Sequence, residues 1–131
     1  MNRLRLRRPG LRARRAILGA YTIFLVSLTH LPRTAAAAIP IQVWDKAAHA
    51  SAYAVLGFLA IWSFGGACGS WRMRRWAVTF AALAVFAVLD EITQPLVGRH
   101  TELLDGVADI LGVAIGMPVS AWWNMRQRQG F

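Results

Sequence analysis

Four long apolar stretches divide the chain, and polar or charged residues separate them. They cover Ala16 to about Leu31, Ala47 to about Phe64, Trp76 to about Ile92, and about Leu103 to Trp123. A helix needs about 17–25 mostly apolar residues to cross a bilayer. No stretch shows the strict alternation that is typical of a strand. The sequence therefore predicts an all-α integral membrane bundle of four transmembrane helices.

Four such helices use most of the 131 residues, so we expect one domain. We predict an Arg-rich cytoplasmic segment at 1–15, the four-helix transmembrane domain at 16–123 and a cytoplasmic tail at 124–131. An alternative for the N-terminal region is a cleaved signal sequence, because the alanines at 35–38 follow a basic and then an apolar stretch. Pro32 and Arg33 precede those alanines and weigh against cleavage, which would leave three helices.

The charges are distributed unevenly between the two sides of the predicted bundle. The chain has 15 basic and 6 acidic residues, a net charge of +9. Twelve arginines lie before the first stretch, between the second and third, or after the fourth, and only Arg33, Lys46 and Arg99 lie on the other side. Because positive charge stays cytoplasmic, both termini should face the cytoplasm. The basic residues thus indicate topology and contact with membrane lipids rather than with nucleic acid.

All six acidic residues fall at the opposite, outer ends of the predicted helices. They are Asp45, Asp90, Glu91, Glu102, Asp105 and Asp109. On one helix Asp45, His49 and Tyr53 are four residues apart, on the next Asp90 shares a face with Gln94, and on the last Asp105, Asp109, Gly112 and Gly116 share a face. Ionisable groups in a membrane segment are costly unless they face the bundle interior or water. We therefore expect a polar pocket that opens outward.

Carboxylates beside a histidine suit acid–base catalysis, with His49, Asp90, Glu91 and Asp105 as the candidate catalytic residues. His49, Glu91 and Asp105 are also candidate ligands for a divalent metal, for which oxygen ligands favour Mg, Mn or Ca and His49 would admit Zn. The alternative is that these groups form ion pairs and hydrogen bonds which only fix the helix packing. Buried charges are, however, an expensive way to build stability.

The remaining residues of the predicted pocket would bind a substrate or shape the site. We assign substrate binding to Lys46, Tyr53, Gln94 and Arg99, of which the two cations would hold an anionic head group. Asp45 and Asp109 would line the pocket, and Gly112 with Gly116 forms a small-residue motif for close helix contact. His30 is expected at the membrane interface, with the pocket as its alternative position.

The ordered set of motifs resembles the VanZ-like family of small bacterial membrane proteins. The resemblance rests on Asp45-Lys46-x-x-His49-x-x-x-Tyr53, Asp90-Glu91-x-x-Gln94, Arg99, and Asp105 with Gly112 and Gly116, and it covers about residues 16 to 118. Asp109 departs from the family pattern, in which we expect an asparagine. The resemblance implies a multi-pass protein of the bacterial cytoplasmic membrane. It also implies a link to teicoplanin resistance, because the family is named for a resistance protein.

These observations support two hypotheses of different classes. The first is an enzyme-like site that acts on a lipid-linked or cell-envelope substrate by acid–base or metal-assisted chemistry. The second is a non-enzymatic module that binds a lipid or an envelope precursor. Proton or cation translocation is disfavoured, because it would require ionisable groups along the cytoplasmic half as well.

Overall fold

The computed structural model describes residues 9–32, 45–64 and 70–129, and in these ranges the chain is helical and contains no strand. The helices are α1 (Leu11–Thr29), α3 (Asp45–Phe64), α4 (Ser70–Thr93), the short 3-10 helix η1 (Gln94–Val97) and α5 (Leu103–Gln129). The all-α prediction is confirmed for this part of the chain. Arg33, the alanines at 35–38 and the side chain of Asp45 lie outside the described residues.

Three of the four predicted spans are long and apolar enough to cross a membrane. They are Lys46–Phe64, Arg72–Val97 and Leu103–Gln127. Helix α1 is not among them, because it ends at Thr29 and its apolar part follows Arg12, Arg14 and Arg15, which leaves too short an apolar stretch for a span. Arginine is a good helix former, so the helix extends into the basic segment. Three helices thus support the prediction of a membrane protein. The fourth membrane span remains a prediction.

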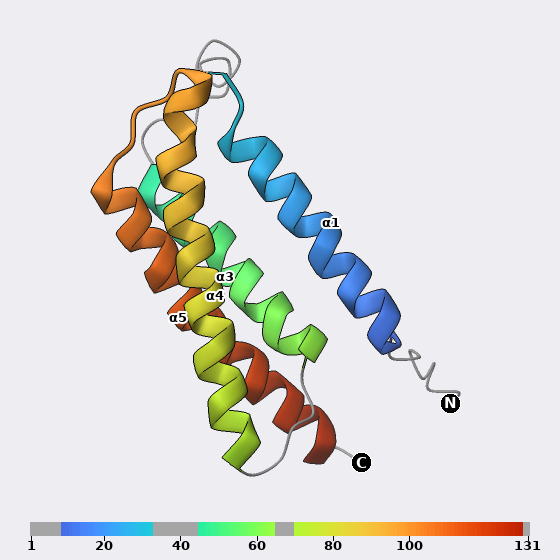
Figure 1. The fold of residues 1–131 in the computed structure, drawn as a ribbon. Coiled ribbons are helices and arrows are strands. Elements are labelled where there is room, and N and C mark those ends of the chain that lie inside the picture. Colours follow the sequence, from blue (N-terminus) through green and yellow to red (C-terminus); the bar gives the residue numbers. More distant parts are fainter. Residues whose placement is uncertain (1–8, 33–44, 65–69, 130–131) are drawn as a thin grey trace.

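The helices pass back and forth along a common direction (Figure 1). The first turns of α3 and α5 lie toward the same end as the last turns of α1 and α4. We call this the acidic end, because Asp90 and Glu91 close α4 while Asp105 and Asp109 lie in the first two turns of α5. The opposite end carries Arg72, Arg74 and Arg75 at the start of α4. The predicted gathering of the acidic residues at one end is therefore present among the described residues.

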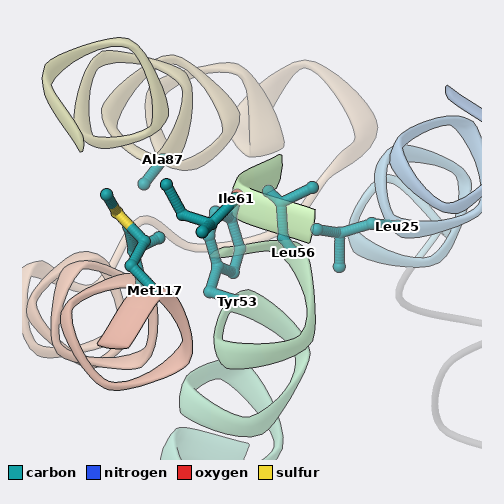
Figure 2. Packing of buried hydrophobic residues seen from close by; sticks show 7 residues of the cluster. Leu25, Tyr53, Leu56, Ile61, Ala87 and Met117 are labelled. Atoms are coloured by element: carbon teal, nitrogen blue, oxygen red, sulfur yellow. The ribbon is translucent and has the colours of Figure 1, made fainter. Parts of the chain in front are cut away.

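Helix α3 lies at the centre of the packing. It has its most extensive contact with α5 and a smaller contact with α1, while α4 packs more on α5 than on α3. Tyr53, Leu56 and Ile61 of α3 lie between Leu25 of α1 and the other two helices (Figure 2). Ala87 of α4 and Met117 of α5 complete the labelled part of this core, and all of these residues are buried. The large apolar side chains on the outer faces remain exposed, as a lipid-facing bundle requires.

Glycines bring the backbones of α3 and α5 into direct contact. A Cβ atom at Gly112 would overlap the carbonyl oxygen of Ala50, and one at Gly116 would overlap that of Ala54. From the other side, a Cβ at Gly57 of α3 would lie 2.9 Å from the carbonyl oxygen of Val113. The close helix contact predicted from the Gly112–Gly116 motif is confirmed.

The contact predicts that Gly116→Ala destabilises the bundle, because the added methyl group meets backbone that cannot rotate away. The expected loss is about 1–3 kcal/mol of unfolding free energy, the usual cost of overpacking. Gly19→Ala in α1 is the matched control, since a Cβ there has no atom within 4 Å and should stabilise the helix by about 0.5–1 kcal/mol. Unfolding in a detergent titration measures both, and equal stability of the two variants would contradict the packing.

Candidate functional site

A histidine and an aspartate meet across the contact between α3 and α5. Nδ1 of His49 lies 3.0 Å from Oδ1 of Asp109. Asp109 is completely buried and His49 nearly so. The second carboxyl oxygen of Asp109, Oδ2, has no hydrogen-bond partner among the described residues. An unpartnered oxygen on a buried carboxyl group is costly. Oδ2 of Asp109 can therefore still accept a hydrogen bond from a ligand.

Asp90 of α4 joins three helices through its carboxyl group. The hydroxyl of Tyr53 on α3 donates to Oδ2 at 2.9 Å, and that of Thr29 on α1 donates to Oδ1 at 2.8 Å. Both hydroxyl groups belong to buried residues. Each oxygen of Asp90 thus accepts one hydrogen bond. The two bonds fix the side chain and link α1 and α3 to α4.

The end of α1 contributes further polar groups to the same place. Nε2 of His30 lies 2.9 Å from the hydroxyl oxygen of Thr93, and Nδ1 lies 3.5 Å from Oδ1 of Asp90. Arg99 donates from Nη1 to the carbonyl oxygen of Thr29 at 3.1 Å. Of the two positions expected for His30, the structure therefore shows the one that joins the polar groups. Thr29 was not predicted, because one threonine at the end of an apolar helix carries no distinguishing signal.

Glu91 lies beside Asp90 but faces a different helix. Its Oε1 accepts a hydrogen bond of 2.7 Å from the backbone N–H of Glu102, which directly precedes α5. Its Oε2 accepts one of 3.0 Å from the amide nitrogen of Gln94. Glu91 thus satisfies a backbone donor at the start of α5. Gln94, which was expected on one face with Asp90, is bonded to Glu91 because the chain changes from α-helix to 3-10 helix at this residue.

A short turn brings α5 back beside the end of α4. Gly98 closes η1 with a φ of 76°, in the left-handed region that favours glycine. The hydroxyl of Thr101 then donates to the backbone carbonyl of Glu91 at 3.3 Å. This return places Gly106, in the first turns of α5, where an added Cβ would lie 3.9 Å from the Glu91 side chain. The turn therefore carries the acidic residues of α5 to those of α4.

Lys46 forms the rim of the site. Its ammonium group lies 2.9 Å from Oε2 of Glu102 and 3.1 Å from Oδ1 of Asp105. The hydrogen bond from Lys46 lowers the pKa of Glu102 below its ordinary value. Asp105 is buried, whereas Lys46 and Glu102 are about half exposed. Lys46 therefore forms ion pairs within the protein. It could bind a substrate, as predicted, only if these ion pairs opened.

Most of the residues predicted to form the site are brought together. Asp109 lies close enough to Asp90 and Asp105 for like-charge repulsion, and Glu91 lies close to His49, Asp105 and Asp109. Arg99 lies at the edge of the group, where it contacts α1. Within the described ranges, no set of three or more His, Cys, Asp and Glu side chains is arranged to hold a metal ion. The predicted ligands His49, Glu91 and Asp105 thus do not form such a set there.

Comparisons with known proteins do not extend this description. No protein-family model, no curated protein and no solved structure matches the chain. The fold and the site together define a helical membrane protein with a buried, carboxylate-rich polar cluster at one end. We refer to His49, Asp90, Glu91, Asp105 and Asp109 as the acidic cluster.

The contact between Tyr53 and Asp90 predicts a specific loss of stability. Tyr53→Phe removes a hydrogen bond to a charged acceptor, which contributes about 1.5–3 kcal/mol. Tyr21→Phe is the matched control, because the Tyr21 hydroxyl on α1 donates at 2.9 Å to a neutral acceptor, the carbonyl of Ala52 on α3. Such a bond contributes about 0.5–1.5 kcal/mol. Detergent unfolding of both variants tests the difference. A Tyr53→Phe variant as stable as the native chain would contradict the role of Asp90.

Proposed function

We propose that this chain is a VanZ-like integral membrane protein whose acidic cluster performs acid–base chemistry on a lipid-linked or cell-envelope substrate. The observation that carries the proposal is the buried His49–Asp109 pair, in which one carboxyl oxygen remains without a partner. Ionisable groups inside a membrane protein are functional more often than structural. The charges of Asp90 and Asp105 act on Asp109, so the site concentrates ionisable groups.

The chemistry follows from the contacts of each side chain. The bond to Asp109 fixes the imidazole ring of His49, as a carboxylate does for a histidine that exchanges protons during a reaction. Glu91, held by Gln94 and the backbone of Glu102, supplies a second carboxyl group in a defined position. Carboxyl groups placed close together can divide into one acid and one base. In this proposal His49 and Asp109 transfer the proton and Glu91 is the base.

Asp90 has a different role in the proposed mechanism. Both of its oxygens accept hydrogen bonds from hydroxyl groups of other helices. It therefore acts as a positioning residue that holds Tyr53 and the end of α1 against the site. Metal-assisted chemistry is not part of the proposal, because the described residues offer no set of three ligands.

The proposal places the acidic end at the outer face of the bacterial cytoplasmic membrane, with α1 as a fourth span and both termini in the cytoplasm. Its support is the position of the arginines, which is opposite to that of the acidic residues. Arg12, Arg15, Arg72 and Arg126 are exposed at the start of α1, the start of α4 and the end of α5. Positive residues of this kind remain on the cytoplasmic side. A role in glycopeptide resistance enters only through the family resemblance and is an association rather than a mechanism.

A binding module without turnover is the second candidate. The observation that favours it is the buried Oδ2 of Asp109, which has no hydrogen-bond partner among the described residues, while hydrogen bonds hold the neighbouring Glu91 and Asp90 in place. Glu91→Asp distinguishes the two functions. It preserves the charge that recognition requires but displaces a catalytic carboxyl group, so a mild effect indicates binding and a severe one indicates catalysis.

Substitution of the histidine tests the proposed activity. Cells that express the native chain should show an altered profile of lipid-linked envelope intermediates in mass spectrometry. His49→Gln and Asp109→Asn should each reduce that change by about 100-fold or more, the contribution typical of general acid–base catalysis. Glu102→Gln is the control, because it alters an exposed carboxyl group at the rim and should retain the change.

Insertion and orientation are checked in the same strains. Thr101→Cys is introduced together with Cys68→Ser, which removes the native cysteine, and intact cells are treated with an impermeant thiol reagent. Labelling at Thr101→Cys shows that the acidic end faces outward. The proposal is wrong if the native chain leaves the lipid profile unchanged, or if an inserted His49→Gln variant retains full activity.

A further inference from the structure

The acidic end carries more negative than positive groups. At this end of the described structure, five carboxyl groups face two permanent cations, Lys46 and Arg99. Lys46 is bound to Glu102 and Asp105 at the rim, and Arg99 donates to a backbone carbonyl. Among the deeper carboxyl groups, the basic side chain beside Asp109 is His49 and the one beside Asp90 is His30. His100 is exposed in the turn before α5.

An excess of negative charge inside an apolar bundle requires a counter-charge, because an uncompensated buried charge is very costly. The position of that charge is indicated by Asp109, which is completely buried with Oδ2 unpartnered. The charges of Asp90 and Asp105 add to the negative potential at Asp109, and Glu91 and Asp109 repel each other. The cluster is thus built to attract a positively charged group.

Three kinds of cation are available at a membrane surface: a metal ion, a proton and an organic ammonium group. The described residues provide no set of three ligands for a metal. A proton would neutralise one carboxyl group but would leave the repulsion among the others. A primary ammonium group supplies a full charge and three hydrogen-bond donors, so it can bind the unpartnered oxygen of Asp109 without the convergent set of ligands that a metal ion requires.

We propose that the acidic cluster binds the primary ammonium head group of a membrane lipid. This inference deepens the proposed function and shares with it the position of the cluster in the membrane, but it requires no turnover. It also revises the expectation of a purely anionic head group, because the deeper part of the cluster repels anions.

Exposed apolar side chains around the cluster argue for a lipid rather than a soluble amine. Leu89 and Ile92 flank Asp90 and Glu91 on α4, and both are more than half exposed. On α5 the acidic residues are likewise preceded by Leu103 and Leu104, which are 83% and 61% exposed. A molecule whose ammonium group lies in the cluster therefore has apolar surface beside it for an acyl chain, and burial of that surface contributes to binding.

Arg99 provides a place for the phosphate that such lipids carry next to the ammonium group. Arg99 donates from Nη1 to the Thr29 carbonyl, and a guanidinium group has five N–H donors in all. Thr29 in turn is bonded to Asp90 through its hydroxyl. Arg99 is thus connected through Thr29 to Asp90, so one cationic and one anionic group of this end are neighbours, as recognition of a zwitterionic phosphoester head group requires.

Retention of defined lipids by the purified, detergent-solubilised chain tests the proposal. Native mass spectrometry compares phosphatidylethanolamine with phosphatidylcholine, in which methyl groups replace the ammonium donors, and with phosphatidylglycerol, which lacks the amine. We expect phosphatidylethanolamine to be retained at least about tenfold better than either, a difference of about one charged hydrogen bond. Asp109→Asn should abolish the preference, and Glu102→Gln should preserve it.

A second variant and a competition experiment complete the test. If Asp109→Asn does not fold, as judged by its circular dichroism, Glu91→Gln takes its place with the same expected loss. Competition by soluble ethanolamine without an acyl chain, at concentrations similar to the lipid, would identify a soluble amine and overturn the lipid assignment. Equal retention of the three lipids would overturn the inference altogether. A selective retention without any change in envelope intermediates would refute the proposed catalysis and leave the binding site intact.

Discussion

The fold of this chain depends on one constraint: carboxyl groups placed in apolar helices must face one another or other polar groups. Neither lipid nor an apolar core solvates an ionised carboxylate, so each such group determines which helix face turns inward. Along the contact between α3 and α5 the pairs follow in order. Lys46 meets Asp105, His49 meets Asp109, and then Ala50 and Ala54 meet Gly112 and Gly116. Polar pairing at the acidic end and close backbone contact further along thus belong to one continuous face.

Polar contacts also hold α1, which carries three arginines near its start. Near the acidic end Thr29 donates to Asp90, and midway Tyr21 donates to the Ala52 carbonyl. Near the opposite end the Ser63 hydroxyl donates to the carbonyl of Arg14, whose guanidinium lies 4.9 Å from the centre of the Trp62 ring. Polar contacts therefore fix α1 along its whole length, where the other helices rely more on apolar packing. A helix attached in this way can carry arginines in its first turns and still belong to the bundle.

Much of this arrangement could be predicted from the sequence, because apolar length and the cost of buried charge are properties of single segments. The helices, the gathering of the acidic residues and the inward face of Asp105, Asp109, Gly112 and Gly116 follow from spacing alone. The partners do not, since they depend on the turn at Gly98 and on helix register. For this reason the shared face of Asp90 and Gln94 did not reveal the bond from Gln94 to Glu91, and the bond from Thr29 to Asp90 was not foreseen. Helix α1 starts at Leu11, before the apolar stretch begins. Hydropathy therefore predicts the apolar part of a helix but not its first residue.

The central claim is that His49 and Asp109 form a buried hydrogen bond across α3 and α5. Nitrogen NMR of the chain labelled at histidine, in lipid nanodiscs, observes the two ring nitrogens of His49 directly. The account predicts an Nδ1 proton that is hydrogen-bonded and protected from exchange with water, and that loses this signature in Asp109→Asn but not in Glu102→Gln. A His49 ring that exchanges freely with water in the native chain, or that is unchanged by Asp109→Asn, would contradict it.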